Sequence, residues 1–441
     1  MKNRITAPAI AVAAVVALSG CNLLDVTNPN SLVEESIMLE AAANGVVNGS
    51  LNRISNGISD VWEGYLVTSD ELYWIGSRDA WGQLDQGYVG NPENEFLDGA
   101  FPSLGQGVWM AQNAVEILSE HAGNNSAFAK DLARAQLYNG MMLMVTGEVQ
   151  EDMTFSNKMD DGAPVGPAAM SGVLDRAISN LDAAVSGFQA LGETDLVISA
   201  RAVRARATMS RTIWNALNPT ATAGGALTFA SSLADANFVI GATGGDWQFQ
   251  LKFSSGSMSC NMCWNVNERK ENQIDLSLVT VDASNDINGI AMNDPVSGVA
   301  DLALIKRLNQ WKGGNYLTSG NQYPPLVISS ERLMRLIVAE DALANGNVAA
   351  FEAQIDAIRA LDGEVEFNSG GAVSDTAMLM HTRRMNVFLM GLRLGDMYRW
   401  GITDPMWHSA SDAILTPGHM LPITIVEIRA NCNLNGQGCA G

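Results

Sequence analysis

Basic residues are scarce in this 441-residue sequence: 26 lysines and arginines face 47 aspartates and glutamates, a formal net charge of −21. Nucleic acids and other polyanions are bound by clustered lysine and arginine side chains, which neutralise phosphates. The acidic balance therefore argues against a nucleic-acid partner. An acidic surface of this strength mainly favours solubility.

Histidine is rarer still, with four residues in the whole chain, and none stands in HExxH or another metal-ligand spacing. GxSxG, Walker and dinucleotide-binding motifs are also missing, and the glycine-rich GATGGDW follows no evident strand-to-helix turn. In the EF-hand register that puts Gly289 sixth, the twelfth position needs a glutamate but holds Pro295. We therefore expect no catalytic residue, no cofactor and no metal site. A looser calcium loop between Asp282 and Asp294 stays open as the alternative.

Long hydrophobic runs are absent except at the N-terminus. Residues 7–18 (APAIAVAAVVAL) are uncharged and apolar, follow Lys2 and Arg4, and precede Leu-Ser-Gly-Cys, which ends at Cys21. A permanent membrane span needs about 20 apolar residues, so this shorter run fits a signal peptide instead. Small residues before the cysteine are typical of a lipoprotein signal. We predict that residues 1–20 are removed and that Cys21 is lipidated; an ordinary signal peptide with a chance cysteine is the alternative.

The predicted lipid would anchor a soluble domain to a membrane. Asn22 follows the cysteine, and the lack of an aspartate there favours the outer membrane. Loss of the signal removes two basic residues, which leaves 24 against 47 acidic ones and a net charge of −23. The expected location is the outer membrane, lipid-anchored, at the cell surface.

Four cysteines remain after lipidation: Cys260, Cys263, Cys432 and Cys439. An even number in an oxidising compartment predicts disulfides. Zinc is the alternative for a CxxC pair, but no histidine lies near either pair. Three pairings are possible, and the two local ones are favoured.

Helical periodicity is the dominant pattern in the mature chain. Apolar residues recur at three- and four-residue steps in the sets Phe128, Leu132, Ala135, Tyr138, Met142, Val145 and Leu174, Ile178, Leu181, Val185, Phe188. A third helix is expected over about 196–217, ended by Asn218-Pro219, and two more over 333–343 and 351–361 with a tight turn between them. These are antiparallel pairs of tetratricopeptide size, without a regular repeat.

Two segments differ in composition from these helices. Residues 66–107 and 218–330 are rich in glycine and polar residues, as in ATAGGA, SSGSMS and VDASNDINGIAMND. Long loops in a compact domain are usually functional. We therefore predict that a ligand binds on these segments, with the helices as scaffold.

Aromatic residues gather on the same segments. Tyr73, Trp74, Trp81 and Tyr88 fall within sixteen residues, among polar residues and glycines, and a second cluster spans 311–316. Sugar rings stack their C–H faces on indole and phenol rings, while polar side chains bind the hydroxyls. The predicted ligand-binding residues are Tyr73, Trp74, Arg78, Trp81, Trp311, Asn315 and Tyr316. Each tryptophan could instead pin its loop to the scaffold, and Trp214 and Trp400 are expected in the core.

Several ordered blocks resemble the SusD/RagB family of nutrient-binding lipoproteins. The strongest is RRMNVFLMGLRLGDMYRWG, residues 383–401, which is similar to the family's arginine-rich helix followed by Gly-x-Arg-x-x-Asp-x-x-Arg-Trp; here these are Gly391, Arg393, Asp396, Arg399 and Trp400. Asn386 and Met390 stand where the family usually has glutamates. SSERLMRLIVAEDALANGN, RAVRARATMS, the ending LPI with Glu427 and Asn431, and Ser69-Asp70-Glu71 also match.

The resemblance implies a mostly α-helical fold, with four tetratricopeptide-like helix pairs and a loop-rich irregular half. It also implies a protein that captures glycans or peptides and caps a TonB-dependent, SusC-like outer-membrane transporter. On this basis residues 21–441 form one SusD-like domain, with the helical scaffold over about 32–65, 108–217, 331–361 and 377–400.

The interpretation is therefore a non-enzymatic, surface-exposed lipoprotein that captures a glycan or similar oligomeric nutrient. Two alternatives belong to other classes. One is an envelope glycosidase that uses loop carboxylates such as Asp70 and Asp294, which would have to lie about 5 to 9.5 Å apart. The other is a tetratricopeptide-like adaptor with no small ligand, although an adaptor has no need for loops rich in glycine and tryptophan.

Overall fold

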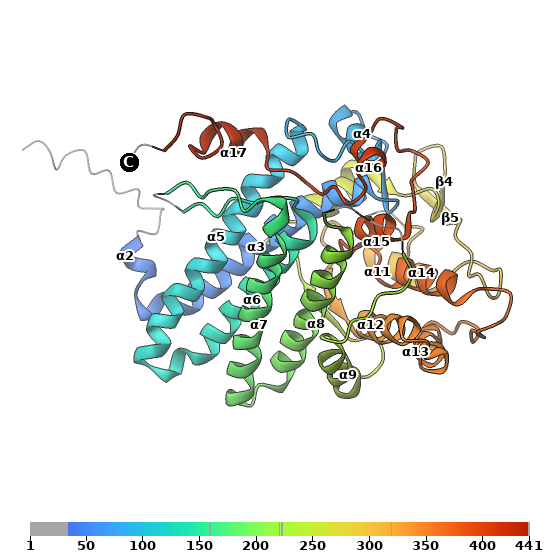
Figure 1. Ribbon diagram of the computed structural model, residues 1–441, viewed down its shortest axis with the longest axis horizontal. Coiled ribbons are helices and arrows are strands. Elements are labelled where there is room, and N and C mark those ends of the chain that lie inside the picture. The colour runs from blue at the N-terminus through green and yellow to red at the C-terminus, as the bar shows by residue number, and fades with distance from the viewer. Residues whose placement is uncertain (1–33, 158–159, 220, 222–223, 319, 440–441) are drawn as a thin grey trace, which may run out of the picture.

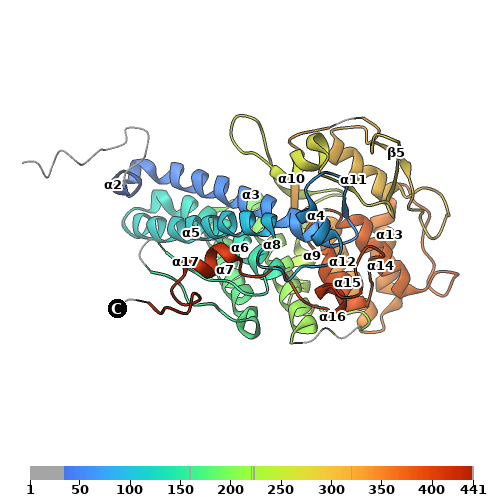
Figure 2. The ribbon, with the colours of Figure 1, turned by 90° about the horizontal axis from the view of Figure 1, so that it is seen from above.

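The computed structural model describes residues 34–157, 160–219, 221, 224–318 and 320–439. Cys21 and the predicted signal peptide lie outside the described residues. The described chain is mostly helical, with short strands, which confirms the expected fold class. The long helices make up one end of the molecule, and shorter helices and the strands make up the other (Figures 1 and 2).

The long-helix end is built from consecutive helices that pack side by side. They are α3 (Ala43–Thr68), α5 (Glu95–Asn124), α6 (Ala129–Val149), α7 (Ser171–Leu191) and α8 (Thr194–Leu217), with the short α2 (Glu34–Ile37), η2 (Glu40–Ala42), η3 (Ser126–Phe128) and η4 (Pro167–Ala169) at their ends. Helix α3 packs on α5, α6 on α7, and α7 on α8. The apolar stripes predicted from periodicity face these contacts; Leu174, Leu181 and Phe188 are fully buried.

Two glycines allow α3 and α5 to approach closely. A Cβ at Gly57 would lie 2.9 Å from the carbonyl oxygen of Ser103 on α5, and one at Gly107 would lie 3.2 Å from the carbonyl oxygen of Arg53 on α3. Side chains at these positions would push the helices apart. Glycine is therefore used here inside helices, for packing.

The other end holds the remaining helices: α4 (Asp79–Asp85), α9 (Leu233–Ala242), α10 (Asn261–Trp264), the π-helix η5 (Asn265–Arg269), α11 (Leu302–Lys312), α12 (Glu331–Ala344), α13 (Val348–Ala360), α14 (Asp375–Asn386), α15 (Arg393–Trp400) and α16 (Asp412–Leu415). The last helix, α17 (Ile425–Ala430), returns to α5. The predicted tight turn between α12 and α13 is present, with Gly346 at φ 72°.

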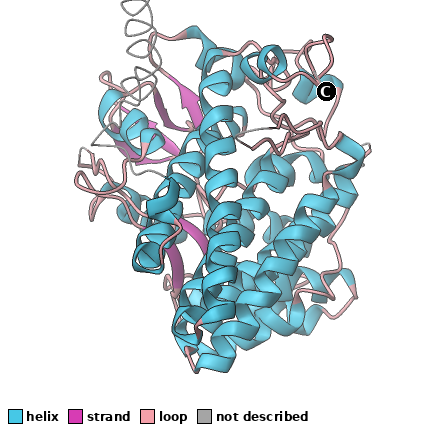
Figure 3. Cartoon of the chain, turned by 90° about the vertical axis from the view of Figure 1, so that its left-hand side faces the viewer, coloured by secondary structure: helices cyan, strands magenta, loops and turns pink. Residues whose placement is uncertain are grey.

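The strands form three separate antiparallel pairs on one side of the helices (Figure 3). They are β1 (Leu72–Trp74) with β3 (Asn272–Ile274), β2 (Gln248–Leu251) with β6 (Leu326–Ser330), and β4 (Val279–Val281) with β5 (Ile287–Ile290). The first pair matters most for the site, because it joins two segments that are 200 residues apart in sequence.

The arginine-rich segment 383–401 forms a buried network of ion pairs. Arg383 and Arg399 both contact Asp396, and Arg399 also binds Glu340 at 2.5 and 3.0 Å. Arg393 makes two hydrogen bonds, of 2.6 and 2.7 Å, to Asp70. Buried charges of this kind are stable only when they are fully paired. Segment 383–401, which carries the strongest family resemblance, therefore stabilises the scaffold.

Asn386, at a usual glutamate position of the family, also lies in a buried ion-pair cluster. Its side-chain oxygen accepts a hydrogen bond of 2.6 Å from Arg332. The charge of that guanidinium is balanced instead by Asp246 and Asp362.

The two segments expected to be loops are partly helical, which corrects the predicted boundaries. Residues 66–107 include α4 and the first turns of α5, whose N-terminus is capped by the side chain of Asn94. Residues 218–330 include α9, α10, η5 and α11. The glycine content suggested loops, but the glycines of α5 lie within the helix, and Gly107 serves the close packing on α3.

None of the helices in the described part of the chain is both long and apolar enough to cross a membrane.

Candidate functional site

Both favoured disulfides are present. Cys260 pairs with Cys263, with Cα atoms 5.2 Å apart, and Cys432 pairs with Cys439, with Cα atoms 4.8 Å apart. The first bond closes the turn that begins α10, and both of its cysteines are buried. It therefore fixes the direction of the residues that follow, Trp264 and Asn265.

A cavity of about 440 Å³ opens where this turn meets α3, α4 and α5. We call it the aromatic cavity. Its lining residues are Asp60, Glu63, Arg78, Trp81, Glu95, Phe96, Gly99, Ala100, Asn261, Trp264, Asn265 and Arg269. The volume lies within the usual range for a small-molecule site, about 300 to 1,000 Å³.

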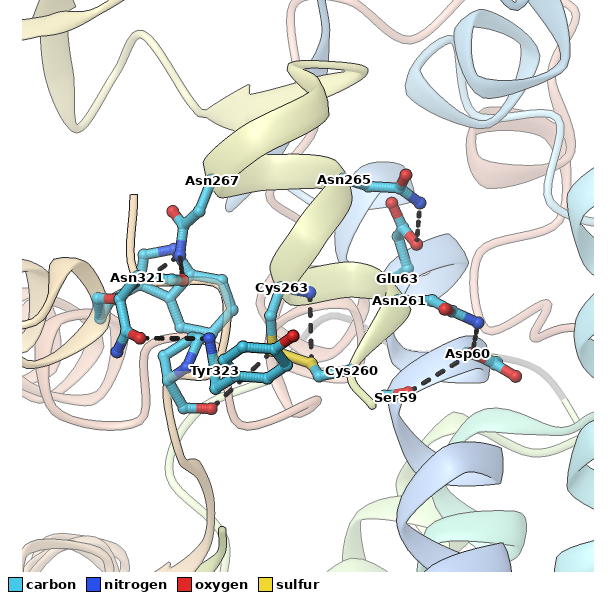
Figure 4. Close-up of a disulfide and its surroundings, with 12 residues drawn as sticks. Ser59, Asp60, Glu63, Cys260, Asn261, Cys263, Asn265, Asn267, Asn321 and Tyr323 are labelled. Atoms are coloured by element: carbon cyan, nitrogen blue, oxygen red, sulfur yellow. Dashed lines mark hydrogen bonds between the residues drawn. A yellow bond between two sulfur atoms is a disulfide. The ribbon is translucent and has the colours of Figure 1, made fainter. Parts of the chain in front are cut away.

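Two carboxyl groups on one face of α3 hold the disulfide turn in place (Figure 4). The amide nitrogen of Asn261 donates to Asp60 at 2.9 Å, and that of Asn265 donates to Glu63 at 2.9 Å. Asp60 and Glu63 are three residues apart on α3, and Asn261 and Asn265 are four residues apart on the turn. Residues at these helical spacings lie on one face, so the two hydrogen bonds lie side by side. Asn272 donates to the other oxygen of Glu63, also at 2.9 Å.

These two carboxyl groups are less acidic than usual. Burial raises the pKa of Glu63 to about 8, although the hydrogen bonds from Asn265 and Asn272 oppose the rise. Burial raises the pKa of Asp60 as well. Glu63 is therefore largely protonated at neutral pH, so this wall of the cavity is polar but carries less negative charge than its composition suggests.

Three aromatic rings contribute to the cavity, and their exposure differs. Trp81 is 3% exposed and stacks on Phe96, with ring centroids 3.8 Å apart and planes 11° apart. Trp264 is 44% exposed, so part of this side chain is open to a ligand. An indole beside amide and carboxyl groups is the chemistry that a sugar ring requires.

Two arginines provide the basic groups of the cavity. The guanidinium of Arg78 lies 4.3 Å from the ring centre of Phe96 and pairs with Glu95. Arg269 lies 5.5 Å from the ring centre of Trp264 and pairs with Glu271 at 2.9 Å. Each arginine is thus placed on an aromatic ring and has a carboxylate partner.

The predicted ligand-binding residues do not all meet in one place. Arg78 and Trp81 line the aromatic cavity, and Tyr316 lines a second cavity. Trp311 is 4% exposed and lines a separate small cavity of about 30 Å³, so it does not share a cavity with Trp81. The reason is that Trp311 lies in the last turn of α11, on its buried side.

The other predicted residues have local contacts. Tyr73 and Trp74 are half-buried in β1, and a Cβ at Gly82 would lie 2.7 Å from the Trp74 ring, so this ring packs on α4. Asn315 is exposed, and its side-chain oxygen accepts the backbone N–H of Leu317. Of the two tryptophans expected in the core, Trp214 is 4% exposed, and Trp400 is partly buried and packs against the hydrophobic core.

Sequence reasoning missed Trp264, Phe96, Asn261 and Asn265. A signal for the first was available: Trp264 directly follows a CxxC pair within a segment rich in glycine and serine. A disulfide-closed turn has little room to bury a following indole, so this tryptophan could have been singled out. Asn261 and Asn265 could not, because their partners Asp60 and Glu63 are about 200 residues away.

The carboxylates named for a glycosidase are bound by arginines. Burial alone would raise the pKa of Asp70, but the hydrogen bonds and charge of Arg393 and the charge of Arg384 hold it below its ordinary value. The same balance, with Arg359 as the partner, lowers the pKa of Asp294. Both side chains are buried parts of the scaffold, a poor setting for general acid catalysis.

The candidate calcium loop is a β-hairpin turn. Asp282 accepts the backbone N–H groups of Ser284 and Asp286, between β4 and β5. Asp294 lies elsewhere, with Asp301 and His381, and carboxylate and ring atoms of these three are within 4.8 Å of one another. The guanidinium of Arg359 already binds Asp294 at 2.9 and 3.1 Å, so the positive charge in this cluster comes from the protein.

Comparison with known proteins identifies the fold. The sequence matches no family model and none of the curated proteins. Solved structures do match: a SusD superfamily protein from Parabacteroides distasonis has a TM-score of 0.59 at 11% identity, over 91% of this chain and 98% of that one. Surface glycan-binding protein A from Bacteroides uniformis has a TM-score of 0.56 at 11% identity, over 90% and 99%.

A third similar structure is a laminarin-binding SusD-like protein, with a TM-score of 0.54 at 14% identity, over 88% of this chain and 97% of that one. The likeness spans nearly the whole of each chain. The chain therefore has the SusD-like fold, as the sequence resemblance implied.

Proposed function

We propose that this chain, which has the SusD-like fold, is a binding protein that captures a glycan or similar oligomeric nutrient and delivers it to a TonB-dependent, SusC-like transporter. One observation carries the proposal: the half-exposed indole of Trp264 stands in a cavity lined by Asn261, Asn265 and two arginines. Similar structures include a laminarin-binding protein and a surface glycan-binding protein.

The chemistry of the aromatic cavity favours an uncharged sugar ring as the part of the ligand that binds there. Its arginines have carboxylate partners, and Glu63 is largely protonated at neutral pH. A sugar ring would stack on Trp264, while the side chains of Asn261 and Arg269 bind hydroxyl groups. Trp81, the predicted stacking residue, supports Phe96 from behind in this arrangement.

The ligand is tested with the soluble chain beginning after Cys21. Isothermal titration against a panel of glycans and peptides should give binding to one glycan class, and Trp264→Ala should weaken it at least several-fold. Product analysis of the same mixtures should show no cleavage. Released sugar at enzymatic rates, lost in Glu63→Gln, would instead establish a glycosidase; binding only to peptides would replace glycan as the ligand class.

Location and partner need separate tests. We propose that Cys21 carries the lipid, so Cys21→Ser should release the protein from outer-membrane fractions or leave it unprocessed. A captured ligand needs a pore to enter the cell, and a pull-down from native membranes in mild detergent should recover a TonB-dependent receptor. Full retention of Cys21→Ser after a high-salt wash, or an eluate without any such receptor, would count against these two assignments.

A further inference from the structure

A second cavity, of about 510 Å³, lies on the other side of the disulfide turn. We call it the lysine cavity, and its lining includes Lys270, Asp286, Asn288, Lys312 and Tyr316. The turn separates the two cavities: Asn261, Trp264, Asn265 and Arg269 line the aromatic cavity, whereas Val266, Asn267 and Lys270 line the lysine cavity. Figure 4 shows this split, with Asn265 and Asn267 directed to opposite sides.

Lys312 is a mostly buried lysine, and no carboxylate in the described part of the chain forms an ion pair with it. It is the last residue of α11 and is only 8% exposed. Its ammonium makes no ion pair and no hydrogen bond with any residue in the described ranges. The end of the helix does not need it either, because the N–H groups of Gly313 and Gly314 bind the carbonyl oxygens of Gln310 and Asn309.

Of the nearby acidic groups, Glu268 is exposed, and Asp286 and Asp282 are engaged elsewhere. Asp286 pairs with Lys270 at 2.8 Å, and Asp282 accepts two backbone N–H groups within the hairpin turn. Burial lowers the pKa of Lys312 to about 8; the charge of Lys270 lowers it too, and Asp286 and Glu268 oppose this from a distance. An unpaired buried charge is costly, and such groups normally have a partner. A ligand anion would supply it.

We propose that the lysine cavity binds the carboxylate or sulfate group of an acidic saccharide, with Lys312 as the cation that faces it and Tyr316 beside the sugar ring. This inference rests on the proposed function, since it narrows the captured glycan to an acidic class. It also gives a role to Tyr316, which the sequence singled out and the aromatic cavity does not use.

Small probes test the inference without knowledge of the natural glycan. Methyl glucuronide carries a carboxylate and glucose 6-sulfate carries a sulfate, each on the same type of sugar ring. Methyl glucoside is the uncharged control. We expect the wild-type chain to bind at least one anionic sugar about tenfold more tightly than methyl glucoside. Lys312→Met should remove this preference, and Lys252→Met, at an exposed lysine, should keep it.

Lysine side-chain NMR of the wild-type chain gives a second readout that needs no variant. The bound anionic sugar should raise the titration midpoint of Lys312, and methyl glucoside should leave it unchanged. The stronger of the two anionic probes identifies carboxylate or sulfate as the group. Equal binding of all three sugars, no binding of either anion, or an unchanged Lys312 midpoint overturns the inference. The proposed function would still be tested separately, by the titration panel of glycans and peptides.

Discussion

Asn265 donates a 2.9 Å hydrogen bond to Glu63, and this contact joins the disulfide-closed turn to the buried residues 61–68 of α3. The two residues are 202 positions apart. Their contact sets where Trp264 stands, because Asn265 is its chain neighbour. The aromatic cavity is therefore a product of the tertiary fold and of one short local loop together.

The first prediction separates the binding tryptophan from the packing ones. Trp264→Ala should lower the affinity for the captured ligand by about 1 to 3 kcal/mol, as for other central binding aromatics, with little change in melting temperature, because the ring is 44% exposed. Trp81→Ala and Trp311→Ala should instead cost about 3 to 5 kcal/mol of stability, since both rings are buried. Melting curves and titrations on all three variants decide this. A stable Trp81→Ala variant with weakened binding would return the site to its first predicted residues.

The second prediction concerns the two disulfides. The double variant Cys260→Ser with Cys263→Ser should lose about 2 kcal/mol of stability by loop-entropy reasoning and should also bind ligand more weakly, because the turn that holds Trp264 is freed. The matched control is Cys432→Ser with Cys439→Ser, which opens a similar small loop near the C-terminus. It should lose stability to a comparable extent and keep its affinity. Equal affinity losses in both double variants would mean that the first disulfide has no special part in the site.

The scaffold could be predicted from the sequence for a physical reason. Helices such as α7 bury one face against their neighbours, so their apolar residues recur at helical spacing, and Leu174, Leu181 and Phe188 showed this directly. The arginine-rich block was recognisable only by its resemblance to a family motif; its buried ion pairs join it to residues far away in the sequence, such as Asp70 and Glu340. Local disulfides were predictable as well, since each closes a short loop.

The site was harder to predict because burial of a loop residue depends on distant segments. Trp81 and Trp264 both sit in polar, glycine-rich sequence, yet Trp81 is covered by Phe96 of α5 and Trp264 is not covered. Only the CxxC pair directly before Trp264 separates the two in the local pattern. Asp286, beside the β4–β5 hairpin, pairs with Lys270 and not with Lys312, so the lack of an ion pair for Lys312 among the described residues became evident only in three dimensions.

The third prediction is a pH dependence of stability centred on Asp85. This side chain is 4% exposed, and burial raises its pKa from 3.8 to about 7, helped by the charges of Asp404 and Asp275 and opposed by the N–H of Trp74. A raised native pKa stabilises the fold fully below pH 3.8, and this contribution is lost as the pH rises through about 7. The upper limit of the loss is about 4 kcal/mol.

Asp85→Asn should therefore be more stable than the wild-type chain at pH 8, and this advantage should disappear at pH 4. Its amide oxygen can still accept the N–H of Trp74. Chemical denaturation across this pH range measures the effect. Asp79→Asn, at an exposed position of the same helix, changes the net charge equally and should follow the wild-type profile. Parallel profiles for Asp85→Asn and the wild type would show that Asp85 ionises normally in the fold.

The last prediction tests the buried ion-pair network against a surface pair. Glu340 is fully buried and binds Arg399 at 2.5 and 3.0 Å, and Arg383 lies 3.6 Å away. Glu340→Ala would leave both guanidinium groups with Asp396 as their shared carboxylate, and breaking one side of a buried pair costs about 3 to 5 kcal/mol. Asp175→Ala, which breaks the exposed pair with Arg211, should cost no more than about 1 kcal/mol, because water screens that pair. Urea denaturation of both variants compares these costs on one scale. If the two losses were equal, segment 383–401 would be held by its apolar residues, and its arginines would need another explanation.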